Sequence, residues 1–205
     1  MFLGKNIFLN KAQVFITCAF TFFLTISCIL CYNIYKKVVI ILSKLNLIFS
    51  GEKFEKVPES SIFLAGPTNR ENIFETSWRK EAVELFEKYN FNGTIFIPEF
   101  RVPRQFSDKS DWEKETEWEW SILDNVSCIM FWIERKSPDR LGLTTNLEFG
   151  TYFQKRPQSI ALGFPESSEN MEWITLRYKT FSGKVPKRTL SETVREAIQI
   201  AKKKG

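Results

Sequence analysis

Glu148 is the residue whose type and surroundings best suit chemistry. It lies in the segment GLTTNLEFG at 142–150, after an apolar run at 127–133. Thr145 and Glu148 have the spacing of a capping box, which predicts that a helix starts there and gives the carboxylate a purely structural role. Alternatively, the helix dipole keeps Glu148 ionised beside a crevice, and an ionised carboxylate can attack an acetal carbon through an oxocarbenium-like transition state.

The sequence contains no histidine, which removes several classes of site. Ser–His and Cys–His nucleophile pairs cannot form, and no imidazole can bind a metal. Cys128 is the sole cysteine after residue 50, and neither a dinucleotide-binding glycine loop nor a P-loop is present, so we expect no metal and no cofactor. Arg79 and Arg135 could hold a phosphate or carboxylate, although exposed arginines are the simpler interpretation.

Apolar runs alternate with helical patterns through the second half of the chain. The expected strands are 61–65, 94–98, 127–133, 159–163 and, as a fifth candidate, 174–178. The expected helices are 78–89, 111–123, 145–153 and 189–201, the last opened by a capping box of Thr189 and Glu192. Strands separated by single helices predict a parallel sheet with a ligand crevice at the carboxyl ends of its strands.

The basic charge of the chain is concentrated near its N-terminus. Residues 1–50 hold five lysines and no acidic residue, which leaves 24 basic and 24 acidic residues in the remainder. A nucleic-acid-binding domain carries a basic stripe on its folded surface, so we expect no nucleic acid as a partner.

Residues 12–35 form a run of 24 residues without a charge. As a helix this run spans about 36 Å, enough to cross a bilayer once, whereas a cleaved signal peptide has a shorter apolar core. We therefore expect an N-terminal flank at 1–11, a transmembrane helix at 12–35, a juxtamembrane linker at 36–58 and a domain at 59–205. Within the linker, 38–49 reads as an interfacial or linking helix, and the placement of lysines favours a cytoplasmic domain on a single-pass membrane protein.

Several short motifs occur in a fixed order along the domain. They are IFLAGPT at 62–68, WR at 78–79, PE at 98–99, WE at 118–119, IMFWI at 129–133 and LTTNLEFG at 143–150. In this combination the sequence resembles the nucleoside 2-deoxyribosyltransferase-like proteins over about residues 60–178. The resemblance implies an α/β domain of flavodoxin/Rossmann-like three-layer architecture that is often oligomeric. It also implies that Glu148 attacks the anomeric carbon of a 2′-deoxynucleoside and passes the sugar to a second base.

The strand ends and the resemblance together place further residues around the substrate. These are Ala65, Gly66, Pro67, Glu99, Glu119, Trp132, Thr145 and Asn146. Transferases of this type commonly have an aspartate where this chain has Ser127 and another acid where it has Gly142. Asp124 and Asp139 each lie three residues from those positions and are candidate assisting acids.

The sequence leaves more than one function open. The leading hypothesis is a membrane-anchored enzyme that cleaves an N-glycosidic bond of a nucleoside or nucleotide through Glu148 and transfers the sugar to a base or to water. A catalytically inactive nucleoside sensor at the membrane is the alternative, favoured by the two missing acids. A purely structural membrane protein explains the apolar run but not the residues of the crevice. The expected partners are a small nucleoside or nucleotide, the lipid bilayer and a second copy of the chain.

Overall fold

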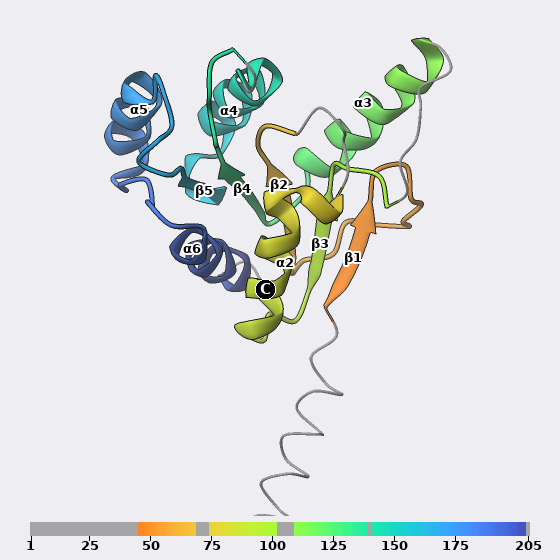
Figure 1. Cartoon of the computed structure of the whole chain (residues 1–205). Helices are drawn as coiled ribbons and strands as arrows, with labels where there is room; N and C mark the ends of the chain where they lie inside the picture. Colours follow the sequence, from red (N-terminus) through yellow and green to blue (C-terminus); the bar gives the residue numbers. More distant parts are fainter. Residues whose placement is uncertain (1–44, 69–73, 102–108, 139–140, 204–205) are drawn as a thin grey trace, which may run out of the picture. The chain divides into compact units, whose positions relative to one another are not determined.

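The computed structural model describes residues 45–68, 74–101, 109–138 and 141–203. The chain divides into two compact units, Met1–Lys44 and Leu45–Gly205, of which the first lies outside the described residues. The second unit is built on a five-stranded sheet in the order β1-β3-β2-β4-β5, in which every pair is parallel (Figure 1). The strands are β1 (Asn46–Phe49), β2 (Ser61–Ala65), β3 (Thr94–Ile97), β4 (Cys128–Trp132) and β5 (Ile160–Gly163). The sequence predicted four of these strands.

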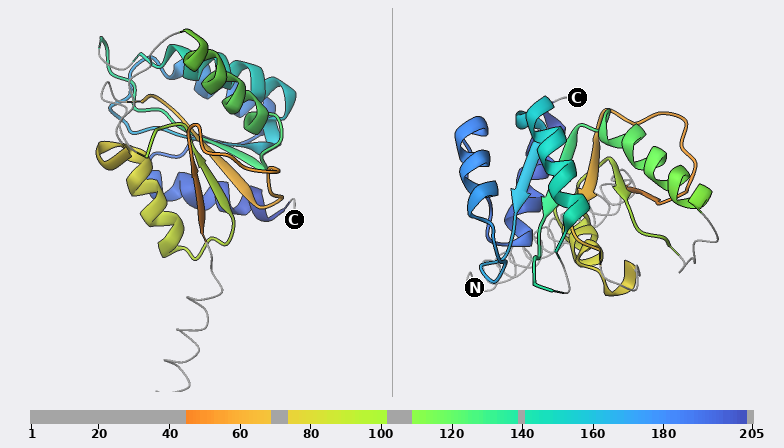
Figure 2. Two further views of the ribbon diagram at one scale, coloured as in Figure 1. Left: turned by 90° about the vertical axis from the view of Figure 1, so that its right-hand side faces the viewer. Right: turned by 90° about the horizontal axis from the view of Figure 1, so that it is seen from above.

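Helices cover both faces of the sheet. The helices are α2 (Trp78–Lys88), α3 (Lys109–Leu123), α4 (Leu143–Lys155), α5 (Glu172–Ser182) and α6 (Leu190–Lys202), with short 3-10 turns η1 (Phe74–Thr76) and η2 (Pro157–Ser159). Helices α2 and α6 pack on one face, and α3, α4 and α5 pack on the other (Figure 2, left). This arrangement confirms the predicted three-layer α/β domain with a parallel sheet.

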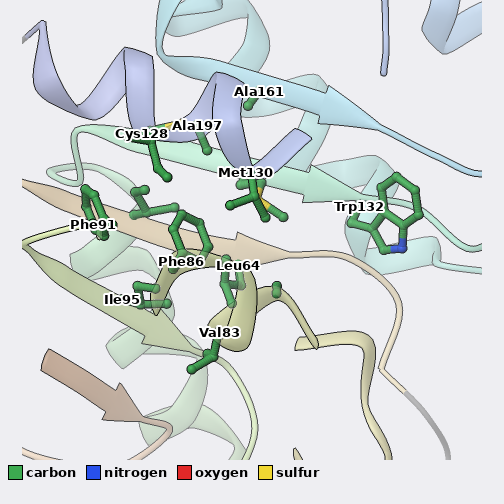
Figure 3. Packing of buried hydrophobic residues seen from close by; sticks show 14 of the residues in the cluster. Leu64, Val83, Phe86, Phe91, Ile95, Cys128, Met130, Trp132, Ala161 and Ala197 are labelled. Atoms are coloured by element: carbon green, nitrogen blue, oxygen red, sulfur yellow. The ribbon is translucent and has the colours of Figure 1, made fainter. Parts of the chain in front are cut away.

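The core consists of two apolar clusters, one on each face of the sheet. Because successive side chains of a strand point to opposite faces, Ile62 and Leu64 belong to the cluster under α2 and α6, whereas Phe63 and Ala65 belong to the other. Figure 3 shows the first cluster between the strands and these two helices, with Trp132 at one end of the group. The interior strands β2, β3 and β4 are buried along their whole length, as expected for a parallel sheet covered on both sides.

The predicted helix at 38–49 is wrong for its described part, because residues 46–49 form strand β1. Asn46 pairs with Thr94 and Phe49 with Ile97 at the edge of the sheet, and the Asn46 amide donates to the Gly93 carbonyl at 2.9 Å. Pairing with a distant strand therefore overrides the local apolar pattern. From Leu45 onward, the segment predicted as a linker packs with the domain.

The candidate fifth strand at 174–178 is also wrong, because these residues lie within α5. Ile174 and Tyr178 are buried and four residues apart, whereas Leu176 between them is 67% exposed. Burial at every fourth residue is the spacing of a helix that presents one face to the core. The short apolar run was thus part of an amphipathic helix.

The predicted transmembrane helix at 12–35 falls outside the residues that the structure describes. Among those that are described, no helix is long and apolar enough to cross a membrane.

Candidate active site

A cavity of about 980 Å³ opens at the carboxyl end of β2, between the start of α4 and one side of α3. Its described lining includes Gly66 and Pro67 after β2, Pro98 after β3, Glu119 from α3 and Glu148 from α4. Strand β2 lies between β3 and β4. The connection that follows β2 runs to β3 on one side, whereas the connection that follows β4 runs to β5 at the opposite edge. Ligands of open α/β sheets bind at such a change of direction.

Gly66 is required at the floor of this cavity because two strand ends approach each other there. A Cβ atom on Gly66 would lie 2.2 Å from the carbonyl oxygen of Trp132 and 2.9 Å from the indole ring of Trp78. The Trp78 indole N–H donates to the Pro67 carbonyl at 3.2 Å and fixes the turn that follows. Any side chain at position 66 would separate β2 from the end of β4.

Helix α4 presents Glu148 differently from the prediction. The helix begins at Leu143 after Gly142, whose φ of 62° is left-handed and which has no side chain to cap the first turn. Thr145 is therefore the third residue of the helix rather than its cap, and the predicted capping box is wrong. Glu148 lies in the second turn of α4 and lines the cavity.

The electrostatic prediction for Glu148 is wrong in its direction. Burial raises the pKa of Glu148 from 4.5 to about 7, and the nearby positive charge of Arg79 opposes this rise. Since Glu148 lies beyond the first turn, the helix dipole stabilises its charge little. The ionised and protonated forms are therefore both populated near neutral pH.

Glu119 faces the same cavity from α3. Burial, followed by the negative charges of Glu148 and Glu115, raises the pKa of Glu119 to about 8, while Arg79 acts in the opposite sense. Two carboxyl groups that share one low-dielectric site cannot both ionise readily, so the second one to titrate retains its proton near neutral pH. Because Glu119 has the additional carboxylate Glu115 beside it, Glu119 is the group that stays protonated.

Arg79 is completely enclosed at the base of the cavity. Its guanidinium donates from Nε to the Leu64 carbonyl at 3.0 Å, from Nη2 to the Gly66 carbonyl at 2.8 Å and from Nη1 to Oε1 of Glu99 at 2.7 Å. The Ser77 hydroxyl donates to the same Glu99 oxygen at 2.7 Å. The simpler expectation of exposed arginines is wrong for both candidates, since Arg79 is 1% exposed and Arg135 is 8% exposed.

The family sequence profile described as "nucleoside 2-deoxyribosyltransferase like" matches residues 59–165. The chain belongs to this family. The comparison with curated proteins gave no match. Membership in the nucleoside 2-deoxyribosyltransferase-like family indicates a nucleoside-related, glycosyl-transferring enzyme at the coarse level. The matched segment runs from just before β2 to just after β5 and contains Arg79, Glu119 and Glu148, whereas β1, α5 and α6 lie outside it.

Some of the residues that the sequence predicted around the substrate line the cavity. Gly66, Pro67, Glu119, Thr145 and Glu148 line the cavity. The side chains of other proposed residues are engaged elsewhere.

Ala65 belongs to the core under α3 to α5, and Glu99 lies behind Arg79, which it contacts. Trp132 packs on the opposite face of the sheet and donates its indole N–H to Glu134 at 3.0 Å. Asn146 accepts a hydrogen bond from Arg135, whose Nη1 also donates to the Asn170 carbonyl at 2.8 Å. Arg135 thus ties the first turn of α4 to the loop before α5.

The two candidate assisting acids differ in what the structure shows. Asp124 lines the cavity but is half exposed and forms an ion pair with Lys155 at 3.4 Å. Asp139 lies outside the described residues.

Sequence reasoning missed three aromatic residues of the cavity, namely Trp112 and Trp120 from α3 and Tyr152 from α4. Trp112 and Trp120 are each 58% exposed, which leaves indole surface for stacking against a planar base. Trp112 and Trp120 are eight residues apart, which is slightly more than two helical turns. This spacing could have indicated that both lie on the same side of α3 as Glu119.

Proposed function

We propose that this protein cleaves the N-glycosidic bond of a nucleoside or nucleotide, with Glu148 as nucleophile and Glu119 as proton donor. The observation that carries the proposal is one cavity lined by two partly buried carboxyl groups, Glu148 from α4 and Glu119 from α3, whose pKa values are raised to about 7 and about 8. Neighbouring acids with separated pKa values are how enzymes assign the roles of nucleophile and acid.

In the first step, the ionised carboxylate of Glu148 attacks C1′ of the sugar and forms a glycosyl ester. The bond from C1′ to the base nitrogen breaks, and its electron pair leaves with the base, which takes the proton of Glu119. In the second step, Glu119 removes a proton from an acceptor base or from water as the acceptor attacks C1′. Glu148 is then released as a carboxylate, and the sugar keeps its original anomeric configuration.

The assignment of Glu119 resolves a difficulty that the sequence raised. Without the aspartates expected at positions 127 and 142, the leaving base lacked an assigned proton donor. Glu119 supplies a partly buried carboxyl group within electrostatic range of Glu148, and the exposed Trp112 and Trp120 offer stacking surfaces for the base at the same cavity. Asp124, the other candidate acid at the cavity, is half exposed and its carboxylate is already paired with Lys155.

The test is release of free base by the purified full chain in detergent. The protein is incubated with a panel of 2′-deoxynucleosides, ribonucleosides, nucleoside monophosphates and NAD, with and without an acceptor base, and products are separated by chromatography. We expect release by the native protein and by Glu192→Gln, and none by Glu148→Gln. Binding of a nucleoside without release from any donor would instead support the inactive sensor.

We also propose that residues 12–35 anchor the domain in a membrane, with the domain on the cytoplasmic side. The support is the uncharged run of 24 residues and the lysines that follow it. Extraction of cell membranes with alkaline carbonate tests the anchor: the full chain should remain in the pellet, and recovery in the supernatant would contradict the proposal.

A further inference from the structure

Arg79 makes more contacts with the protein than the proposed chemistry requires. Its three hydrogen bonds join the carboxyl end of β2, through the Leu64 and Gly66 carbonyls, to Glu99 just after β3. A guanidinium has five N–H donors in a rigid plane, so three such bonds fix its position and orientation. Its charge is therefore held at one point beside the cavity, which Arg79 also lines.

Glu99 is an unusual partner for this arginine. Its side chain is fully buried, one oxygen accepts from both Arg79 and Ser77, and Oε2 has no partner among the described residues. A buried ion pair with an unsatisfied oxygen is weak support for stability, because well-packed apolar residues of similar volume are often at least as stabilising. The pair is therefore better explained by an electrostatic role than by a structural one.

The charged and titratable groups around Glu148 come from three helices. Arg79 on α2 attracts its negative charge. Burial is the main cause of the raised pKa values of Glu119 on α3 and of Tyr152 on α4, and the charge of Glu148 adds to both. Glu115 acts on Glu119 from the next turn of α3. Of the two cations that line the described cavity, Lys155 is 60% exposed and paired with Asp124, whereas Arg79 is enclosed.

We propose that Arg79 is a positioning residue that keeps Glu148 ionised for attack, and that Glu99 limits this effect by partly neutralising Arg79. Loss of the positive charge of Arg79 would favour the protonated form of both cavity carboxyls. An uncompensated Arg79 would favour their ionised forms, and so would disfavour the proton donor. The pair thus adjusts the charge of the site between these two extremes. This inference rests on the proposed roles of Glu148 and Glu119.

The proposal predicts opposite effects for two substitutions. Glu99→Gln removes the compensating charge and should lower the pKa of Glu148, by about one pH unit or more. The double substitution Arg79→Gln with Glu99→Gln removes both charges, keeps a hydrogen-bonding pair, and should raise the pKa of Glu148. Arg79→Lys keeps the charge but loses the planar set of bonds, so the pKa should move less than in the double variant.

The experiment is a ¹³C NMR titration of the full chain in detergent with glutamate labelled at the side-chain carboxyl. The Glu148 signal is assigned as the one missing from Glu148→Gln, and circular dichroism verifies the fold of each variant. Shifts of the Glu148 midpoint in opposite directions support the inference, whereas a midpoint unchanged in folded Glu99→Gln overturns it. Each variant decides alone: if Glu99→Gln does not fold, an unchanged Glu148 midpoint in the double variant or in Arg79→Lys overturns the inference, and a raised midpoint in the double variant supports it.

The titration uses no substrate, so its result is independent of whether the protein releases a base. If the native protein releases base, the acidic limb of its pH–rate profile should move in the same direction as the Glu148 midpoint. A merely structural role of Arg79 and Glu99 would lower the rate or the stability without moving this limb. Absence of base release would contradict the proposed function. The NMR titration would still test whether Arg79 and Glu99 set the pKa of Glu148.

Discussion

Two helix starts in the described part of this protein share the sequence pattern Thr-x-x-Glu, but only one of them is capped by its threonine. At α6, Thr189 is the N-cap: its hydroxyl accepts from the Glu192 amide at 3.2 Å and donates to the Glu192 carboxylate at 2.7 Å. At α4, the left-handed Gly142 starts the helix two residues before Thr145. Glu192 is thereby used in an exposed cap, whereas Glu148 is partly buried in the wall of the cavity.

The difference shows how the starting residue of a helix decides the role of a carboxylate. A capping glutamate satisfies backbone donors and remains in water, so its loss costs stability. A glutamate one turn later has no backbone donor to satisfy and retains its acceptor oxygens for a ligand. The two glutamates therefore provide a matched pair of variants within one chain.

The largest expected effect is on catalysis. Glu148→Gln should reduce base release by about a thousandfold or more, because the amide cannot form the glycosyl ester. Glu192→Gln should leave base release unchanged and alter the free energy of unfolding by less than about 0.5 kcal/mol. Release rates by chromatography and urea unfolding of both variants test the contrast. Equal release rates for the two variants would remove Glu148 from the mechanism.

The next effect separates the proton donor from the nucleophile. Glu119→Gln should slow base release by about 10²- to 10⁴-fold for poor leaving groups, since protonation of the base is lost. The native profile should rise through about pH 7 and fall above about pH 8, as Glu148 and then Glu119 lose their protons. Glu119→Gln should lack the alkaline fall. A fall that persists in this variant would assign the donor to another group.

A smaller effect concerns stability and pH. Burial raises the pKa of Glu148 from 4.5 to about 7 and that of Glu119 from 4.5 to about 8. At pH values between the unfolded and the folded pKa, the folded state therefore binds more protons than the unfolded state. The free energy of unfolding should therefore fall as the pH rises from about 4.5 to 8. Urea titrations of Glu148→Gln should show a flatter pH dependence than those of Glu192→Gln. An identical slope would mean that Glu148 titrates normally.

The smallest effect tests the helix starts themselves. Thr189→Val removes the capping hydroxyl of α6 and should lower the free energy of unfolding by about 1 kcal/mol. Thr145→Val removes a hydroxyl that does not cap α4, and should change stability by less than about 0.5 kcal/mol. Thermal or urea unfolding of the two variants measures the difference. A larger loss for Thr145→Val would show that position 145 has a capping role after all.

The elements that sequence reasoning found are those with a strong local signal. Strands β2 to β5 are short apolar runs with turn residues after them, and α6 has an apolar face and a capping box. Strand β1 was missed because its identity depends on pairing with β3. Helix α5 was taken for a strand because its buried residues lie within a short, mostly apolar segment.

The site was predictable in its residue types and less so in its charges. Glu148 and Glu119 could be chosen from their motifs, and both line the cavity. Their raised pKa values and the enclosure of Arg79 depend on side chains that α2, α3 and α4 bring together from distant parts of the sequence. Single-sequence patterns carry no information on that packing.

The most direct test of the central claim is a search for sugar bound to Glu148. The full chain is mixed with the donor panel, quenched in acid within the first turnover, digested, and analysed by mass spectrometry. The account predicts a peptide that spans residues 142–150 with the added mass of a pentose or deoxypentose on Glu148, absent from Glu148→Gln. Rapid base release in the absence of any adduct, with activity retained in Glu148→Gln, would contradict it.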